Sequence, residues 1–195
     1  SNRISPTTAE HVRRDLEGRI DMILDAGPTT GGLESTVIDL MADPPRLLRP
    51  GLITVRQLEA IVGPISILAA QATSKPNDEP IRSPGQLERH YSPRAKLICL
   101  NPAGERPVHE LLQSVTRVGW LRLASASPNP YVNTSVLEKT SKIIEMPLDP
   151  VTYSARLYAA LHELDGADVE LIVVDSPPNE PPWLAIHDRL RRASN

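Results

Sequence analysis

The chain has 195 residues, of which 40% are hydrophobic and 23% charged, and its formal net charge is −3 at pH 7. This length suffices for one large domain or two small ones, and the near-neutral charge gives no support for a broad surface that binds RNA directly. No run approaches the roughly 18 apolar residues of a membrane span, and the N-terminal residues lack the apolar core of a secretion signal. We therefore expect a cytoplasmic protein without membrane contact. The single cysteine, Cys99, leaves no partner for an internal disulfide.

The first predicted helix follows the stretch "SPTT" near the N-terminus. Thr7 and Glu10 have the spacing of a capping box, and Gly18 marks the end of the helix. The next residues, 19–27, predict a strand because apolar side chains recur up to a closing glycine.

Two β-rich pieces and a second helix complete the first unit. Residues 35–40 and 45–51 flank a turn rich in proline and are expected to pair as antiparallel strands. A helix is predicted over residues 54–63, with Thr54 as its N-cap and Gly63 as its end.

The second unit begins after a connection, residues 69–93, that has no sustained periodicity and several prolines. Beyond it, four aliphatic runs predict strands, and the stretches between and after them predict helices. The strands are expected at 96–100, 118–123, 142–148 and 171–177, and the helices at 108–115, 150–167 and 183–193. Alternation of strands and helices favours a small Rossmann-like α/β domain whose mostly parallel sheet is covered on both sides.

Hydroxyl side chains and glycines at turns of the first unit are candidates for binding an anion. Ser5 precedes a helix start, where free backbone N–H groups suit a phosphate, although plain capping is the alternative. Residues 27–36, "GPTTGGLEST", lack the lysine of a phosphate-binding P-loop; their Gly31–Gly32 pair would let the backbone pass close to a ligand beside Ser35, or simply form a hairpin loop. Arg49, at a strand end, could hold a phosphate with two parallel hydrogen bonds or reach solvent.

Other familiar kinds of site are not predicted. The histidines have no metal-ligand spacing, so we expect no structural metal. No nucleophile has a partnered base, which argues against covalent catalysis. The second unit lacks the glycine loop of dinucleotide sites, and its basic ending "DRLRRAS" is expected to compensate the helix dipole or to snorkel to solvent rather than to bind RNA.

Five blocks in order, "SPTTAEHV", "GLESTVID", "LLRPG", "SPGQLERHYSP" and "AIHDRLRRA", resemble the threonylcarbamoyl-AMP synthase family in its long form. The resemblance implies an α/β protein in three parts. Residues 1–68 would be the C-terminal half of a YrdC-like catalytic domain, residues 69–93 a linker that acts as a lid, and residues 94–195 the Rossmann-like C-terminal domain.

The resemblance also implies a reaction and its residues. L-threonine, bicarbonate and ATP would give threonylcarbamoyl-AMP and pyrophosphate, and other tRNA-modifying proteins would use the product to make threonylcarbamoyladenosine in tRNA. The serine of "SPT" and the arginine of "LLRPG", Ser5 and Arg49, would contact ATP, and Ser35 of "EST" would contact threonine. Tyr91 of the linker would close over the substrates. Mg²⁺ is expected on the ATP phosphates rather than in a protein cage.

The chain departs from the family in one respect. A Lys-x-Arg block and most of a Ser-x-Asn block precede "SPTT" in the family and are not found here, so the resemblance implies a chain that lacks the N-terminal part and is weakly active. The open sheet edge that this would leave suits pairing with a second copy of the chain. The alternative is a non-catalytic nucleotide-binding or docking module derived from such an enzyme.

Overall fold

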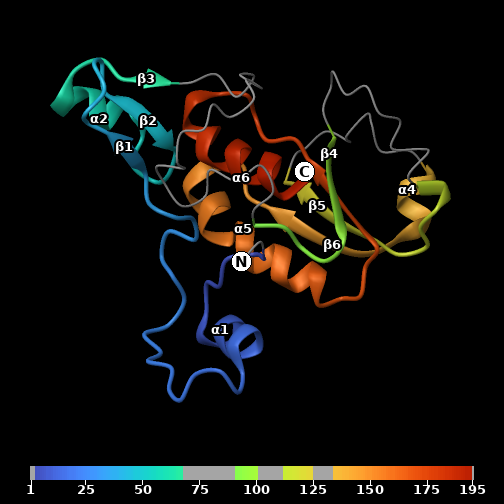
Figure 1. Cartoon of the computed structure of the whole chain (residues 1–195). Helices are drawn as coiled ribbons and strands as arrows, with labels where there is room; N and C mark the ends of the chain where they lie inside the picture. The colour runs from blue at the N-terminus through green and yellow to red at the C-terminus, as the bar shows by residue number, and fades with distance from the viewer. Residues whose placement is uncertain (1–2, 68–90, 101–111, 125–133, 195) are drawn as a thin grey trace, which may run out of the picture.

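Two β-sheets divide the molecule into two units (Figure 1). The structure is a computed structural model, and it describes residues 3–67, 91–100, 112–124 and 134–194. A three-stranded sheet lies in the first unit and a four-stranded sheet in the second. The predicted linker, residues 69–93, therefore lies outside the described residues except for its last three positions.

The first unit is built around the small sheet in the order β1-β2-β3. Its elements are α1 (Ala9–Leu16), β1 (Val37–Asp39), β2 (Arg46–Arg49), α2 (Val55–Val62) and β3 (Ser66–Ile67). The predicted antiparallel pairing is confirmed, because Ile38 lies opposite Leu47. The short β3, which pairs parallel to β2, was not predicted.

The helix predicted after "SPTT" exists, but its cap is one residue later than expected. The side chain of Thr8, not Thr7, accepts the hydrogen bond from the His11 backbone N–H. Glu10 does not reach back to a cap; its carboxylate lies 2.7 Å from the Arg13 guanidinium one turn ahead. A salt bridge on the exposed helix face has replaced the capping box.

The strand predicted over residues 19–27 is wrong. This segment has no strand, and within the described residues no neighbouring strand pairs with it. Met22 is 76% exposed and Leu24 is 89% exposed. Apolar spacing alone does not make a strand, because its backbone groups also need a partner.

The helix α2 has the limits that the sequence predicts. Thr54 accepts from the Gln57 backbone, and the Gln57 side chain accepts from the Thr54 backbone, which completes a capping box. Gly63 ends the helix with φ of 79°, a value that suits glycine.

The second unit contains a four-stranded sheet in the order β4-β7-β5-β6, and every pair in it is parallel. Its elements are β4 (Lys96–Leu100), β5 (Val118–Leu123), α4 (Thr134–Lys139), β6 (Thr140–Met146), α5 (Pro150–Asp165), β7 (Leu171–Asp175), a 3₁₀ turn (Pro181–Trp183) and α6 (Leu184–Ser194). The predicted parallel α/β arrangement is confirmed. Every residue of β7 is buried, as its unbroken aliphatic run implies for a central strand. The first half of the helix predicted at 108–115, residues 108–111, lies outside the described residues.

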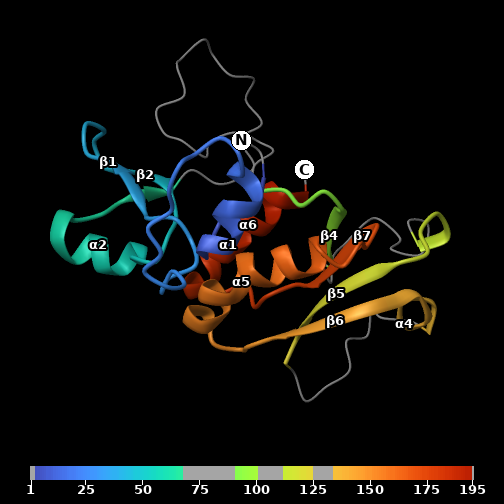
Figure 2. The ribbon, with the colours of Figure 1, turned by 90° about the horizontal axis from the view of Figure 1, so that it is seen from below.

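The main hydrophobic core lies between this sheet and the two helices α5 and α6, which share one of its sides (Figure 2). Leu157, Tyr158 and Ile186 are completely buried there. On the other face, a smaller cluster around Trp120 and Val173 includes Leu112. By contrast, the first unit has four buried hydrophobic side chains among its described residues: Ile4, Leu33, Leu47 and Ile65.

No helix within the described ranges is long and apolar enough to cross a membrane.

Candidate functional site

The carboxylate of Glu34 is the meeting point of the two units. Its Oε1 accepts a hydrogen bond of 2.5 Å from the Ser5 hydroxyl. Its Oε2 accepts from the Tyr158 hydroxyl at 3.0 Å and from Arg189 Nε at 2.7 Å. Ser5 belongs to the first unit, whereas Tyr158 and Arg189 lie on α5 and α6. Both oxygens of one carboxylate therefore join segments that are far apart in the sequence.

Ser35 and Arg49 lie next to this carboxylate. Arg49 Nε donates to the Ser35 carbonyl at 3.0 Å, and Arg49 Nη2 lies 3.3 Å from the Ser35 hydroxyl. The two backbones approach closely, since a Cβ at Gly51 would lie 2.4 Å from the Thr36 nitrogen. Glycine in "LLRPG" thus permits the contact between the blocks that carry Arg49 and Ser35.

Tyr91 is only 2% exposed and packs against Tyr158 and Arg189. Its ring centroid lies 5.7 Å from that of Tyr158, and the Arg189 guanidinium carbon lies 5.3 Å from the Tyr91 ring centroid. The backbone φ of Tyr91 is 63°, which is unusual for a residue with a side chain. This turn directs the ring inward, where the two neighbours hold it.

The electrostatics of the group favour an ionised Glu34 beside neutral tyrosines. Burial opposes ionisation of the Glu34 carboxyl, but the Ser5 hydrogen bond and the Arg189 charge outweigh burial and hold its pKa below the ordinary value. Burial and the Glu34 charge raise the pKa of Tyr158 and of Tyr91. Tyr158 accordingly keeps its proton, and its hydroxyl donates a hydrogen bond to the carboxylate.

The structure thus brings together the four residues that the sequence predicts, Ser5, Ser35, Arg49 and Tyr91. Ser5 does not lie in the first turn of α1, as a phosphate site on the helix end would require; it lies three residues before the N-cap. Its hydroxyl points to Glu34 instead. The binding roles of all four residues stay predictions.

Sequence reasoning missed Glu34, Tyr158 and Arg189. Glu34 and Arg189 each stand inside a block that carries the family resemblance, and this was the only available signal. The basic ending of the chain was expected to reach solvent or compensate a dipole. That interpretation is wrong for Arg189, whose side chain is 1% exposed and is paired with Glu34 and with Asp188.

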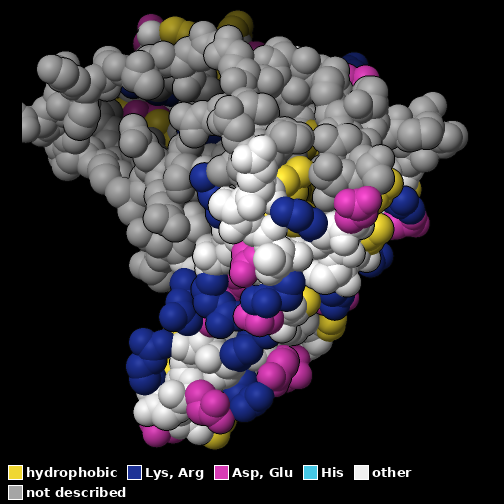
Figure 3. All heavy atoms as spheres, turned by 90° about the vertical axis from the view of Figure 1, so that its right-hand side faces the viewer, with side chains coloured by type: hydrophobic (Ala, Val, Ile, Leu, Met, Phe, Trp, Pro, Cys, Tyr) yellow, Lys and Arg dark blue, Asp and Glu magenta, His cyan; other side chains and the backbone are white. Residues whose placement is uncertain are grey.

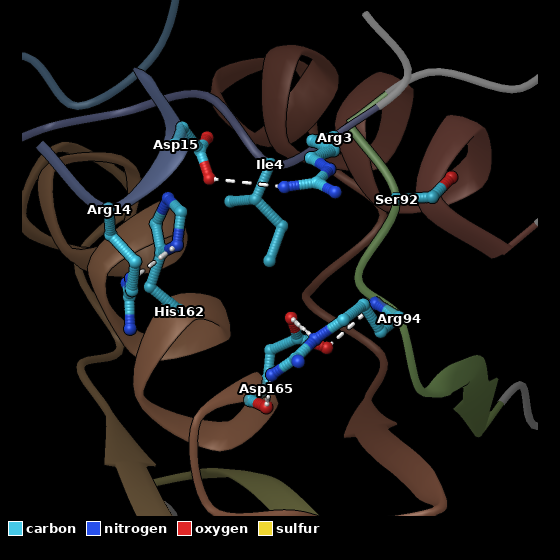
Figure 4. A pocket seen from close by; sticks show the side chains of 8 residues that line it. All are labelled: Arg3, Ile4, Arg14, Asp15, Ser92, Arg94, His162 and Asp165. Carbon is cyan, nitrogen blue, oxygen red and sulfur yellow. Dashed lines mark hydrogen bonds and ion pairs between the residues drawn. The ribbon is translucent and has the colours of Figure 1, made fainter. Parts of the chain in front are cut away.

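A hollow of about 250 Å³ lies beside the residues that gather around Glu34. It is lined by three arginines, two aspartates, His162, Ile4 and Ser92 (Figure 4). Ile4 and Ser92 are chain neighbours of Ser5 and Tyr91. The arginines are largely engaged: Arg3 lies 3.5 Å from Asp15, and Arg94 lies 3.0 Å from Asp165. The hollow therefore adjoins the four predicted residues but contains none of them.

Two histidines hold the Ser5 segment against α5. His162 Nε2 lies 3.1 Å from the Ser5 carbonyl, and Arg14 lies 3.2 Å from the other ring nitrogen. The His11 ring stacks on His162 with centroids 3.8 Å apart. Burial lowers the pKa of both, that of His11 to about 4, and the nearby positive charge of Arg14 adds to this. A neutral His162 can accept from Arg14 and donate to Ser5 at once.

Charged side chains of both signs are mixed over the lower part of the surface in Figure 3, where α1 lies. Arg13, for example, lies between Glu10 and Glu17. Among the described residues, no group of three or more His, Cys, Asp or Glu side chains could hold a metal ion.

Comparison with known protein families assigns both parts of the chain. A family model described as "Threonylcarbamoyl-AMP synthase, C-terminal domain" matches residues 53–195. A second, described as "Telomere recombination", matches residues 1–51.

Curated relatives match over the whole chain. It is 39% identical to threonylcarbamoyl-AMP synthase of Bacillus subtilis (strain 168) and 32% identical to that of Pyrococcus abyssi (strain GE5 / Orsay). It covers 54% and 55% of these two proteins. The chain thus spans about half the length of the curated relatives it matches.

Solved structures agree with this similarity. All of the chain superposes on 55% of P. abyssi Sua5 complexed with L-threonine, with a TM-score of 0.77 and 29% identity. A variant of P. abyssi Sua5, in which an adjacent histidine and tyrosine are replaced by alanine, gives a TM-score of 0.77 with 30% identity and 54% coverage. The mixed α/β fold expected from the sequence is confirmed by these similarities.

Proposed function

Since this chain belongs to the threonylcarbamoyl-AMP synthase family, we propose that it serves in making threonylcarbamoyl-AMP from L-threonine, bicarbonate and ATP. In this proposal Ser5 and Arg49 contact ATP, and Ser35 contacts threonine. Tyr91 acts as a lid over the substrates. The product then passes to other proteins that modify tRNA.

One observation carries the proposal: the four residues, drawn from separate blocks, meet around Glu34. Arg49 touches Ser35, the Ser5 hydroxyl touches the carboxylate of the residue before Ser35, and Tyr91 packs on the arginine that binds the same carboxylate. The P. abyssi relative with bound L-threonine supports threonine as a substrate. In the other P. abyssi structure an adjacent histidine and tyrosine are both replaced. This chain has one such His-Tyr pair, His90–Tyr91, which supports the choice of Tyr91 as a residue of the site.

The chemistry asks for charge neutralisation rather than a protein nucleophile. The threonine amine takes up carbon from bicarbonate, with loss of water, and becomes a carbamate. A carbamate oxygen then forms a bond to the α-phosphorus of ATP while the bond to pyrophosphate breaks. Negative charge builds on the phosphate oxygens, and the guanidinium of Arg49 is suited to stabilise it.

Holding two anions side by side is the other requirement. A bound threonine carboxylate and the ATP phosphates repel each other, so a site that holds them in the reacting orientation lowers the activation free energy. Mg²⁺ would enter with the ATP phosphates as part of the substrate, which agrees with the oxygen-rich surroundings that this ion prefers.

The test is pyrophosphate release that depends on both threonine and bicarbonate. We expect Ser35→Ala to raise the KM for threonine, and Arg49→Met to lower kcat/KM by about tenfold or more, because a charged contact to the transition state is lost. Arg46→Met is the matched control: Arg46 lies on the same strand with an exposed side chain, and its loss should leave the rate unchanged. Equal rates in the Arg49 and Arg46 variants would reject the assignment of Arg49.

The second candidate is a nucleotide-binding or docking module without catalysis. Exposed apolar side chains on the first unit favour it, among them Met41 at 92% and Ile61 at 83% exposure, because such surfaces are typical of protein contacts. Binding of ATP without release of pyrophosphate in the presence of threonine and bicarbonate would select this alternative.

A further inference from the structure

We infer that Arg189, on the C-terminal helix α6, is a positioning residue for the site proposed above. The inference rests on the proposed function, and it gives the C-terminal unit a part in the site. None of the four predicted residues lies on α5 or α6. The guanidinium of Arg189 nevertheless reaches the carboxylate around which they gather.

The contacts of Arg189 are directional and buried. Nε donates to Glu34 Oε2 at 2.7 Å, and Nη2 lies 3.4 Å from the Glu34 backbone carbonyl. Nη1 donates to Asp188 at 2.8 Å, and the same group faces the Tyr91 ring. One rigid, planar cation thus binds both the side chain and the backbone carbonyl of Glu34 and supports the Tyr91 ring. The single ammonium of a lysine cannot reproduce these contacts.

The fixed position of Glu34 in turn orients Ser5 and Ser35. With Arg189 and Tyr158 on Oε2, the other oxygen, Oε1, is directed at the Ser5 hydroxyl. The backbone that Arg189 also holds leads directly to Ser35. Ser35 in turn accepts a hydrogen bond from Arg49 through its carbonyl. A single guanidinium therefore fixes both the segment before β1 that carries Ser35 and the hydroxyl of Ser5.

Arg189 has a second effect, through its charge. Glu34 is negative, and it lies beside residues that we propose to bind the phosphates of ATP and the carboxylate of threonine. A carboxylate at this place repels the ATP phosphates and the threonine carboxylate unless its charge is neutralised nearby. Its close ion partner is the buried Arg189, so that loss of Arg189 should both loosen Ser35 and expose the substrates to an unneutralised charge.

The test compares whole 195-residue chains by calorimetric titration with L-threonine and with ATP and Mg²⁺. In Arg189→Met we expect affinity for both to fall by about tenfold or more, as for other charge pairs that lose one partner. Arg189→Lys should recover part of the ATP affinity through charge but little of the threonine affinity. Adding Glu34→Gln to Arg189→Met should also recover ATP affinity, because the unneutralised charge disappears; a merely structural role for Arg189 predicts no such recovery. Arg191→Met, which removes an exposed partner of Asp188, is the control and should bind as the unaltered chain does.

Amide hydrogen exchange without ligand separates this inference from the proposed function. We expect exchange over residues 33–36 to rise in Arg189→Met and Arg189→Lys but not in Arg191→Met, with circular dichroism as the check on folding. If the unaltered chain binds neither substrate while exchange rises, the proposed function fails and the ordering by Arg189 stands. Unchanged exchange, or unchanged affinities in a folded Arg189→Met chain, overturns the inference; should that variant not fold, Arg189→Lys decides by the same measurements.

Discussion

The stacked pair of His11 and His162 makes the junction of α1 with α5 sensitive to acid. Both rings are surrounded so that the neutral form is favoured: burial and Arg14 oppose a positive charge, while Asp15 gives a smaller opposite effect on both. Glu10 acts in the same sense as Asp15 on His11, and Asp165 does so on His162. Protonation of either ring would place a second cation against Arg14.

The free energy of unfolding should therefore fall as the pH drops from about 6.5 toward 4. A histidine whose pKa is lowered by folding takes up its proton more readily in the unfolded chain, so the stabilisation is complete above the ordinary value of 6.5 and declines below it. Chemical denaturation at a series of pH values measures this slope. Carboxylates such as Glu34 act lower, below their ordinary value of 4.5.

The control is His162→Gln, whose amide can accept from Arg14 and donate to the Ser5 carbonyl but does not titrate. We expect a shallower slope between pH 6.5 and 4.5 in this variant. An identical slope would show that the histidines do not cause the acid sensitivity.

Residues that a motif marks could be predicted at this scale, whereas their partners could not. Ser5, Ser35 and Arg49 stand in recognisable blocks, and the structure brings them together. Glu34 and Arg189 are 155 positions apart in the chain, and nothing in either local pattern indicates that the charges meet. Local rules describe caps and turns, but a pairing of this kind depends on how whole elements pack.

Among the elements, α5 has the most complete set of local signals. Asp149 caps it by accepting from the Thr152 backbone at 2.7 Å, and Pro150 occupies its first turn. Eight of its side chains are buried. The helix packs on the sheet, and its Tyr158 and His162 contact Glu34 and Ser5 of the first unit. Both its start and its apolar face could be predicted from the sequence.

Replacing Asp149 by Ala should lower the free energy of unfolding by about 1 kcal/mol, in the range of about 0.5–2 kcal/mol found for lost caps. The capped N–H groups would lose their acceptor at an exposed helix end, where water compensates only in part. Asp149→Ser is the matched control, since serine is also a good cap, and should stay within a few tenths of a kcal/mol. Urea unfolding of the three chains gives the comparison, and equal midpoints would contradict the capping role.

The contrast with residues 19–27 shows why elements differ in predictability. Each strand of the second unit combines an aliphatic run with at least one paired neighbour, and β7 and β5 are paired on both sides. Helix α2 has its own cap and end. Residues 19–27 have an apolar pattern but no pairing partner in the described structure, and Met22 and Leu24 stay exposed. A helix satisfies its backbone by itself, whereas a strand depends on another segment.

At the scale of the whole molecule, the parallel sheet followed from the alternation of strands and helices, but the docking of the two units did not. The docking depends on a close approach of backbones at Gly32. A Cβ at this position would lie 2.3 Å from the Ser154 carbonyl oxygen and 2.6 Å from the Ala155 Cα, both on α5. A glycine in a loop does not indicate from sequence which distant helix it touches.

Gly32→Ala should therefore separate the units while leaving the second one folded. The first unit has few buried side chains of its own and would lose its support, whereas the core between the sheet, α5 and α6 comes mostly from the second unit; among residues 3–67, Ile4 and Leu33 are its members. Limited proteolysis should then cut within residues 3–67 much faster than in the unaltered chain and leave a resistant fragment that contains α5, β7 and α6. Gly18→Ala separates this effect from backbone strain, because Gly18 has φ of 74°, close to the 71° of Gly32, but open space around it. The strain of a positive φ alone costs about 1 kcal/mol, so Gly18→Ala should be cut only slightly faster. If the two variants are cut at the same rate, the contact of Gly32 with α5 does not hold the units together.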